Sequence, residues 1–219
     1  MFAARNKRGA KRFSLLLLEE EEDYLNDWVA TCAWPASVPG NWQGCARLSG
    51  RVRLCTRSLF FDPDDVRVPI ARLPLSHVDE LRAAGGGASF VVAAWRVTKV
   101  KANCEEAPYV TEAAPPGVPP PVWAFTLSYA PLAGFMDLAQ ELLRLSKLPK
   151  MERAAALEAM VRAREDAAAF DSSRLVDFSE RIVWMGAAMQ LTPLVREHGL
   201  LAVSDARVYF QVWSASVGV

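Results

Sequence analysis

The stretch GRVRLCTRSLFFDP, residues 50–63, decides the fold class. Two short runs, Val52/Leu54 and Leu59/Phe61, alternate between apolar and polar positions and flank the small polar segment 56–58. Alternation with a period of two, interrupted by a short polar turn and closed by Asp-Pro, is typical of an antiparallel β-hairpin. We therefore expect a β-rich domain built around this hairpin.

Further strand signals lie on both sides of the hairpin. Residues rich in β-branched and aromatic side chains predict strands at 66–75, 89–100 and 122–129. The leucine-rich stretch 12–19 is interpreted as a buried strand, although its period does not distinguish strand from helix. Leu25, Trp28, Val29 and Cys32, which follow the acidic run 19–23, have the spacing of a short helix, and a continued strand fits the same residues.

Turn-forming and helical segments complete the chain. Residues 35–49 and 102–121 carry many turn residues and prolines and are expected to be loops, and glycines 85–87 predict a turn. The helical signals are one apolar face, Phe135, Leu138, Leu142 and Leu145, and an Ala/Glu/Arg-rich stretch at 150–169. Five to seven strands followed by one amphipathic helix predict an α+β fold, a pleckstrin-homology (PH) barrel plugged by its last helix. A generic α+β sandwich is the alternative.

Composition and charge exclude several classes of protein. The chain has 219 residues, 25 Lys and Arg against 25 Asp and Glu, and 52% hydrophobic residues, so a folded protein without a global charge attraction to nucleic acid is expected. No apolar run approaches the ~20 residues of a membrane-spanning helix. The opening residues 1–11 are basic and are expected to form a disordered arm rather than a transit peptide or a secretory leader.

The sequence carries no recognisable catalytic or metal-binding motif. The four cysteines, Cys32, Cys45, Cys55 and Cys104, form no C-x-x-C pair, so we expect reduced thiols in the cytoplasm and no zinc site. Nucleophile, metalloprotease and P-loop motifs are missing, and glycines 85–87 lack the third glycine of a dinucleotide loop. The prediction is a protein that is not an enzyme and has no cofactor.

The hairpin recurs once. GRVRLCTRSLFF at 50–61 corresponds to GLLAVSDARVYF at 199–210, an offset of 149 residues, with the glycine, the apolar alternation and the paired aromatic positions in register. This self-similarity predicts two related modules.

The hairpin pattern resembles that of GRAM domains, and a longer likeness extends over the chain. The blocks 12–24, 50–75, 106–109 and 170–211 resemble, in order and spacing, the amino-terminal region of FAN-type proteins, which are BEACH-domain adaptors. The resemblance implies a PH-like domain followed by a GRAM/PH module and then a BEACH domain. The expected organisation is a PH-like domain at 12–148, a helical linker at 149–172 and a partial GRAM/PH-like module at 173–219, whose exposed aromatics either dock on the first domain or stay poorly ordered.

Basic residues are the candidates for binding an anionic ligand, the one activity for which the sequence indicates a mechanism. Alternation places Arg51 and Arg53 on one face of the hairpin, with Arg57 beside them, and Lys99 shares a face with Lys101 on a later strand. These five residues are candidate ligands for an anionic lipid, in particular a phosphoinositide phosphate. The alternative is that they are solvated edge residues that guard against strand pairing.

Together these patterns predict a cytoplasmic adaptor that is peripheral at membranes and acts in signalling or trafficking. The expected partners are an anionic membrane lipid and a BEACH domain or receptor complex, and no nucleic acid is expected. The second hypothesis is a protein–protein interaction module that binds no lipid.

Overall fold

Nine strands form one antiparallel sheet in the computed structural model, which describes residues 13, 17–38, 47–85, 87–100, 109–167, 169–191 and 196–212. The strand order is β5-β6-β9-β1-β2-β3-β4-β7-β8. The strand bounds are β1 Tyr24–Ala33, β2 Leu48–Cys55, β3 Ser58–Pro63, β4 Ile70–Pro74, β5 Val78–Ala83, β6 Ser89–Ala94, β7 Arg96–Val100, β8 Tyr109–Ala113 and β9 Val122–Leu127.

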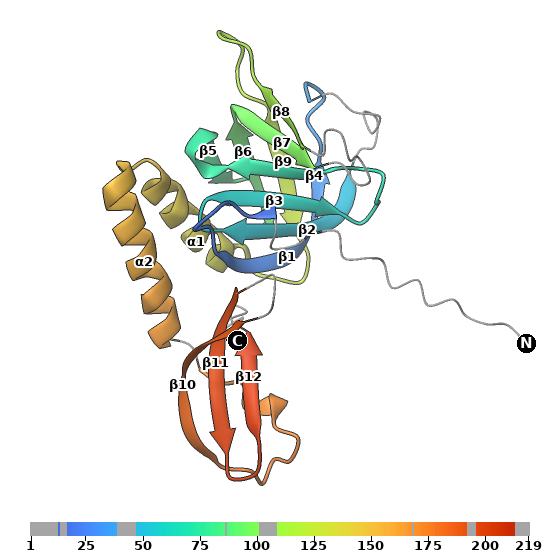
Figure 1. Ribbon diagram of the computed structural model, residues 1–219. Coiled ribbons are helices and arrows are strands. Elements are labelled where there is room, and N and C mark those ends of the chain that lie inside the picture. Colours follow the sequence, from blue (N-terminus) through green and yellow to red (C-terminus); the bar gives the residue numbers. More distant parts are fainter. Residues whose placement is uncertain are drawn as a thin grey trace, which may run out of the picture.

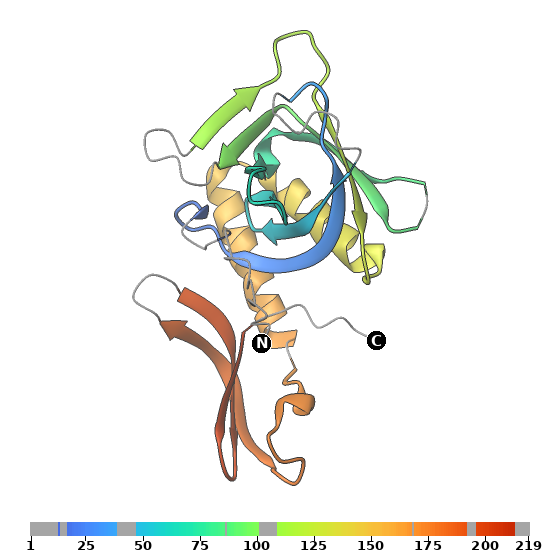
Figure 2. The same ribbon diagram turned by 90° about the vertical axis from the view of Figure 1, so that its right-hand side faces the viewer.

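The sheet curls into a barrel because one residue connects its two ends. β6 pairs with β5 and β9 near one end of the strand order, whereas β7 pairs with β4 and β8 at the other. Only Trp95 separates β6 from β7, and its backbone N–H donates to the carbonyl of His77 over 2.9 Å. The chain therefore turns a corner there, and Figure 2 shows the strands curving into a ring.

Helix α1, Leu132–Ser146, lies across one opening of this ring (Figure 1). Its apolar side chains on one face, Phe135, Met136, Ala139, Leu142 and Leu145, are buried in the core of the barrel. The Phe135 ring lies 5.0 Å from that of Trp28 and 4.3 Å from that of Phe90, and all three side chains are buried. The last turn of α1 is tied to the sheet by Lys147, whose Nζ donates to the carbonyl of Val78 over 2.6 Å. The predicted α+β PH-like barrel plugged by an amphipathic helix is thus confirmed.

Several predicted elements differ from the structure. The helix alternative for the residues after the acidic run 19–23 is wrong, because Tyr24–Ala33 form strand β1. A register shift between Tyr24 and Asn26 puts Leu25 in the core with Trp28 and Cys32, whereas Val29 is exposed. The predicted strand 89–100 is two strands, β6 and β7, because the chain turns a corner at Trp95. The predicted loop 102–121 contains β8, while residues 101–108 lie outside the described part of the chain.

The barrel sheet has nine described strands rather than five to seven, because β5 and β8 carry little apolar periodicity. Leu17 and Leu18, the described leucines of the predicted strand 12–19, lie outside any strand and pack with Phe13 on the outer face of the barrel. The hairpin 50–63, the strands β4 and β9, and the two helices lie where the sequence predicts them, with α2 at Lys150–Ala167. The basic arm 1–11 lies outside the described residues.

A separate three-stranded sheet, β10 Ile182–Leu191, β11 Arg196–Ser204 and β12 Val208–Val212, repeats the geometry of β1–β3. Gly50 pairs with Pro63 and Val52 with Phe61; 149 residues later, Gly199 pairs with Val212 and Leu201 with Phe210. β1 and β10 are each 10 residues long, and each has its register shift after the first residue, at Tyr24/Asn26 and at Ile182/Trp184. The repeat seen in the sequence is therefore a repeat of structure.

The contacts at the start of each unit are also duplicated. The backbone N–H of Asp23 donates to Thr56 Oγ1, and the backbone carbonyl of Asp23 accepts a hydrogen bond from Thr56 N–H, both over 2.9 Å. At the corresponding place Arg181 N–H donates to the Asp205 carboxylate over 3.2 Å, and Asp205 N–H donates to the Arg181 carbonyl over 3.0 Å. In both sheets an aromatic side chain that precedes the first strand packs on an aromatic residue of the third strand. The ring centroids of Phe13 and Phe60 lie 5.2 Å apart, and those of Phe170 and Tyr209 lie 5.8 Å apart.

Candidate functional site

The predicted lipid ligands of the hairpin lie on the outer face of β2 and are held by carboxylates. Val52 and Leu54 point into the core, so Arg51 and Arg53 share the opposite face as predicted. Arg51 Nε contacts the Asp27 carboxylate, and Arg53 lies 3.4 Å from Asp27 and 3.2 Å from Asp62. Burial alone would raise the pKa of Asp27, but hydrogen bonds from Arg51 and Tyr24 and the two arginine charges hold it below its ordinary value.

The other predicted ligands do not join them. Arg57, in the β2–β3 turn, pairs with Glu21 over 2.9 Å, and Lys99 on β7 is 4% exposed and pairs with Glu112. Lys101 lies outside the described residues. An incoming phosphate would therefore have to exchange with an internal carboxylate at each of the four described positions, and their role as lipid ligands stays a prediction.

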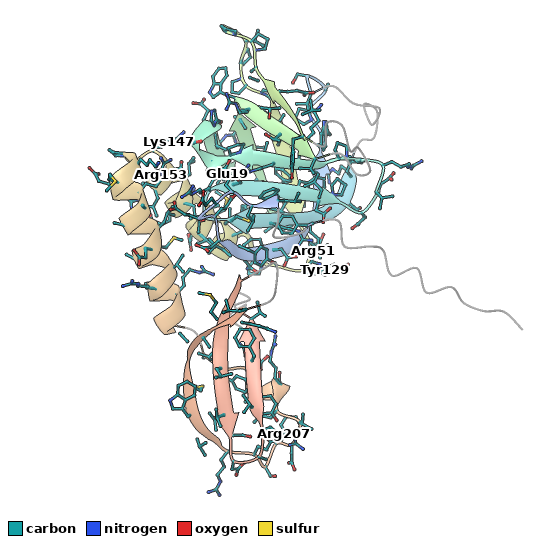
Figure 3. All side chains as sticks on the ribbon, in the orientation of Figure 1. Glu19, Arg51, Tyr129, Lys147, Arg153 and Arg207 are labelled. Atoms are coloured by element: carbon teal, nitrogen blue, oxygen red, sulfur yellow. The ribbon has the colours of Figure 1, made fainter. Side chains whose placement is uncertain are left out.

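Three exposed side chains, those of Val29, Arg51 and Tyr129, nevertheless lie on one side of the barrel. Val29 pairs with Arg51 across β1 and β2, and the carbonyl of Val29 accepts a hydrogen bond from Ser128 N–H over 2.8 Å. This bond places the β9–α1 connection beside the strands, and Figure 3 shows Arg51 and Tyr129 together on one side of the barrel. Tyr129 is fully exposed and has φ 62°, a left-handed backbone that a bulky residue rarely adopts.

The patch was missed because the sequence assigns Tyr129 to a strand. Alternation in 122–129 continues through Tyr129, but β9 ends at Leu127 and the chain turns outward before α1. The only sequence signal was the Ala130-Pro131 pair that follows, which marks a turn before a helix start.

A second feature is a pocket of about 620 Å³ on the outside of the barrel, where β4, β7 and β8 meet the start of α2. The segment around Leu17 and Leu18 forms one wall, and Leu157 of α2 packs on the core from the other side. Its charged lining residues are mostly cationic: five cations, Arg57, Arg72, Arg96, Lys150 and Arg153, against two acidic residues, Glu19 and Glu21.

Internal ion pairs neutralise only part of this positive charge. Arg72 pairs with Glu19 over 2.8 Å and with Glu22 over 3.2 Å, and Arg57 pairs with Glu21. Within the described residues, Arg96 and Lys150 have no carboxylate within ion-pair distance. The pocket therefore holds a net positive charge that no described side chain balances.

The side chain of His77 lines the pocket, and its Nδ1 lies 3.0 Å from Ser76 Oγ. Burial and then the positive charges of Arg96 and Lys147 lower the pKa of His77 below 6.5. The sequence alone could not bring together cations that come from β4, β7 and α2.

The described residues also bear on the expectations of no metal site and of reduced cysteines. No group there of three or more His, Cys, Asp and Glu side chains is arranged to hold a metal ion. Cys32 and Cys55 are free and buried, and burial raises the pKa of the Cys55 thiol well above its ordinary value, so a thiolate is disfavoured. Cys45 and Cys104 lie outside the described residues. Among the described helices, none is long and apolar enough to cross a bilayer.

Comparison with known proteins identifies a protein family and a similar solved structure. Residues 1–157 match the family model described as "FAN protein N-terminal PH domain". Among solved structures, the Vps36 N-terminal PH domain is similar at 10% sequence identity with a TM-score of 0.39, over 58% of this chain and 83% of that chain. The structural likeness is too distant to support a functional argument.

Proposed function

Because the chain belongs to the family of FAN N-terminal PH domains, we propose that it is the membrane-associated binding portion of a BEACH-family adaptor. The family identifies it as a PH-type binding module, and such domains are generally not enzymes. The proposal adds that the module acts in signalling or trafficking in the cytoplasm and touches an anionic membrane. Its further partners would be a BEACH domain and a receptor or scaffold protein.

The observation that carries the membrane contact is the patch formed by Val29, Arg51 and Tyr129. Tyrosine at a membrane interface buries its ring among acyl chains while its hydroxyl stays hydrated, and a neighbouring arginine attracts anionic headgroups by ~1 kcal/mol. A left-handed backbone at a non-glycine residue costs of order 1–3 kcal/mol, and no packing within the domain repays it, because the Tyr129 side chain is fully exposed. That combination supports a role for the tyrosine outside the fold.

Replacing Tyr129 with glycine tests this contact without damaging the domain. Glycine adopts a positive φ freely, so Tyr129→Gly should unfold at the same or a higher temperature than the parent chain. Losing about 1 kcal/mol of ring burial should weaken binding to phosphatidylserine vesicles about five-fold in co-sedimentation. Arg51→Gln should weaken it by a similar factor.

A matched control uses another arginine that is paired with a carboxylate on the surface. Arg144 on α1 pairs with Glu141 over 2.7 Å, away from the patch, so Arg144→Gln should leave vesicle binding unchanged. Equal binding by the parent chain and Tyr129→Gly would refute the membrane contact.

A protein-interaction module without lipid binding remains the second candidate function. The specific observation in its favour is that Arg51, Arg53, Arg57 and Lys99 all have internal carboxylate partners. It predicts no sedimentation of the parent chain with anionic vesicles at any phosphoinositide content.

We further propose that residues 173–219 belong to a second PH/GRAM-like module joined through a helical linker at 149–172. Three features that occur in both sheets support this division: the pairing register of the hairpin, the register shift in the first strand, and the aromatic pair on the outer face. Positions that are interior in the first unit are exposed in the second: Leu25 is 7% exposed and Leu59 0%, whereas Val183 and Val208 are 65% and 66% exposed. The second unit thus presents the apolar face that a complete barrel would enclose.

A further inference from the structure

Ser76 carries a sequence signal that the proposed function does not use. It is followed by Asp79 and Glu80, and no other serine or threonine of the chain has an acidic residue three positions later. Protein kinases choose their substrates partly by such charge patterns, and acidophilic kinases such as casein kinase 2 select a carboxylate at this third position. The sequence therefore marks Ser76 as a candidate phosphorylation site.

The structure leaves this motif accessible. Ser76 is exposed on the short 3₁₀ helix Leu75–His77. Asp79 and Glu80 are exposed on β5, which ends the strand order and, among the described strands, pairs with β6 alone. The hydroxyl and both acids can therefore be reached from solvent along the unpaired edge of the sheet.

The backbone around Ser76 is fixed by hydrogen bonds from two other elements. Trp95 N–H, at the corner between β6 and β7, donates to the carbonyl of His77 over 2.9 Å. Lys147, which follows α1, donates from Nζ to the carbonyl of Val78 over 2.6 Å, and this Nζ lies 3.4 Å from the carbonyl of Ser76. The serine hydroxyl is thus held in place relative to the cations around it.

A phosphate on Ser76 would enter a cluster of cations. Ser76 Oγ lies 3.0 Å from Nδ1 of His77, and the pocket that both side chains line also contains Arg96 and Lys150. Within the described residues, Arg96 and Lys150 have no carboxylate within ion-pair distance, so both are free to pair with a phosphate. Burial and then the charges of Arg96 and Lys147 lower the pKa of His77, so positive charge already acts at the ring that touches Ser76.

From these features we infer that Ser76 is a phosphorylation site of an acidophilic kinase, and that cations of the domain itself hold the resulting phosphate. In the transfer, Ser76 Oγ bonds to the γ-phosphorus of ATP, and the bond from that phosphorus to the β,γ-bridging oxygen breaks. ADP leaves, and the hydroxyl proton passes to the catalytic base of the kinase. The phosphate, with a charge of about −1.5 to −2 at pH 7, then accepts hydrogen bonds from His77, Arg96 and Lys150. It ties the Leu75–His77 helix to β7 and to α2, and none of these residues belongs to the proposed membrane contact.

Treatment of the folded full chain with casein kinase 2, ATP and Mg²⁺ tests the site. Tandem mass spectrometry should find phosphate on Ser76, and Asp79→Asn should slow its incorporation at least about ten-fold, because the recognition carboxylate is lost. Glu158→Gln removes another exposed carboxylate, on α2, and should leave the rate within about two-fold of the parent. An unmodified Ser76, or an equal rate in the parent and in Asp79→Asn, would overturn the site.

Phosphorus NMR of the phosphorylated chain tests whether the phosphate is held. The second pKa of a free phosphoserine is about 6, and that of the held phosphate should be lower, because neighbouring cations favour the dianion. Arg96→Gln combined with Lys150→Gln should return this pKa to about 6. Arg144→Gln combined with Arg162→Gln should not, since both arginines lie outside the pocket lining. A phosphoserine that titrates in the parent chain as it does in a free peptide would overturn the capture.

Thermal unfolding gives an independent readout of the same capture. Charge-assisted hydrogen bonds from the phosphate to β7 and α2 should raise the unfolding temperature by about 2–4 °C. The Arg96/Lys150 double variant should lose that gain, and a lower unfolding temperature after phosphorylation of the parent would contradict the capture. Tyr129→Gly should be phosphorylated at the rate of the parent chain, so failure of the membrane proposal and failure of this site are separable.

Discussion

Replacing Phe135 with alanine should lower the free energy of unfolding by about 4 kcal/mol, because it removes the side chain that plugs the barrel. Phe135 is fully buried and contacts Trp28 and Phe90 through its ring, so no neighbouring side chain can fill the resulting cavity without leaving its own contacts. Urea unfolding followed by tryptophan fluorescence measures the change.

A second helix residue provides the control. Met151 on α2 is 84% exposed, so Met151→Ala should change the stability by less than about 0.5 kcal/mol. A small effect of Phe135→Ala would mean that α1 does not close the sheet, and the barrel geometry would then be wrong.

Replacing Gly50 with alanine should destabilise the domain by about 3 kcal/mol, because β2 and β3 approach too closely there for a side chain. A Cβ at this position would lie 2.4 Å from the carbonyl oxygen of Asp62 and 2.8 Å from the Cα of Pro63. Both obstacles are backbone atoms of the paired strand, so the hairpin has to open for the methyl group to fit. Thermal unfolding of the two proteins gives the difference.

The matched substitution is Gly134→Ala on α1, where a Cβ meets nothing within 4 Å. Alanine there should stabilise the helix by roughly 0.5–1 kcal/mol. If the two glycine variants shift stability in the same direction, the close approach of β2 and β3 is not what requires Gly50.

The close approach also explains why the glycine recurs. At Gly199 a Cβ would lie 2.5 Å from the carbonyl oxygen of Gln211, so the same contact is built twice, 149 residues apart. The glycine, the alternation and the aromatic pair of the hairpin are short-range features, and for that reason the sequence alone predicts the hairpin and its repeat.

Features that depend on distant partners were not predictable in the same way. The register shift in β1 puts Leu25 in the core with Trp28, three residues later, and only the pairing with β2 reveals that shift. The corner at Trp95 lies inside a continuous apolar stretch, so no local signal divides β6 from β7. Three of the five side chains of β8 are exposed, and the prolines that follow the strand favour a loop.

The candidate site shows the same limit. Alternation correctly placed Arg51 and Arg53 on one face, but their partners Asp27 and Asp62 lie on the two neighbouring strands. The register that brings them together is a property of the folded sheet. The basic pocket likewise collects Arg96 and Lys150 from segments more than 50 residues apart in the chain.

Hydrogen–deuterium exchange of the full chain on phosphatidylserine vesicles tests the central functional proposal most directly. Binding through the proposed patch should slow exchange in the peptides that cover residues 27–31, 49–53 and 128–131, relative to the same chain with neutral phosphatidylcholine vesicles. Slowed exchange confined to α2 or to the second sheet, or no difference between the two kinds of vesicle, would contradict the account.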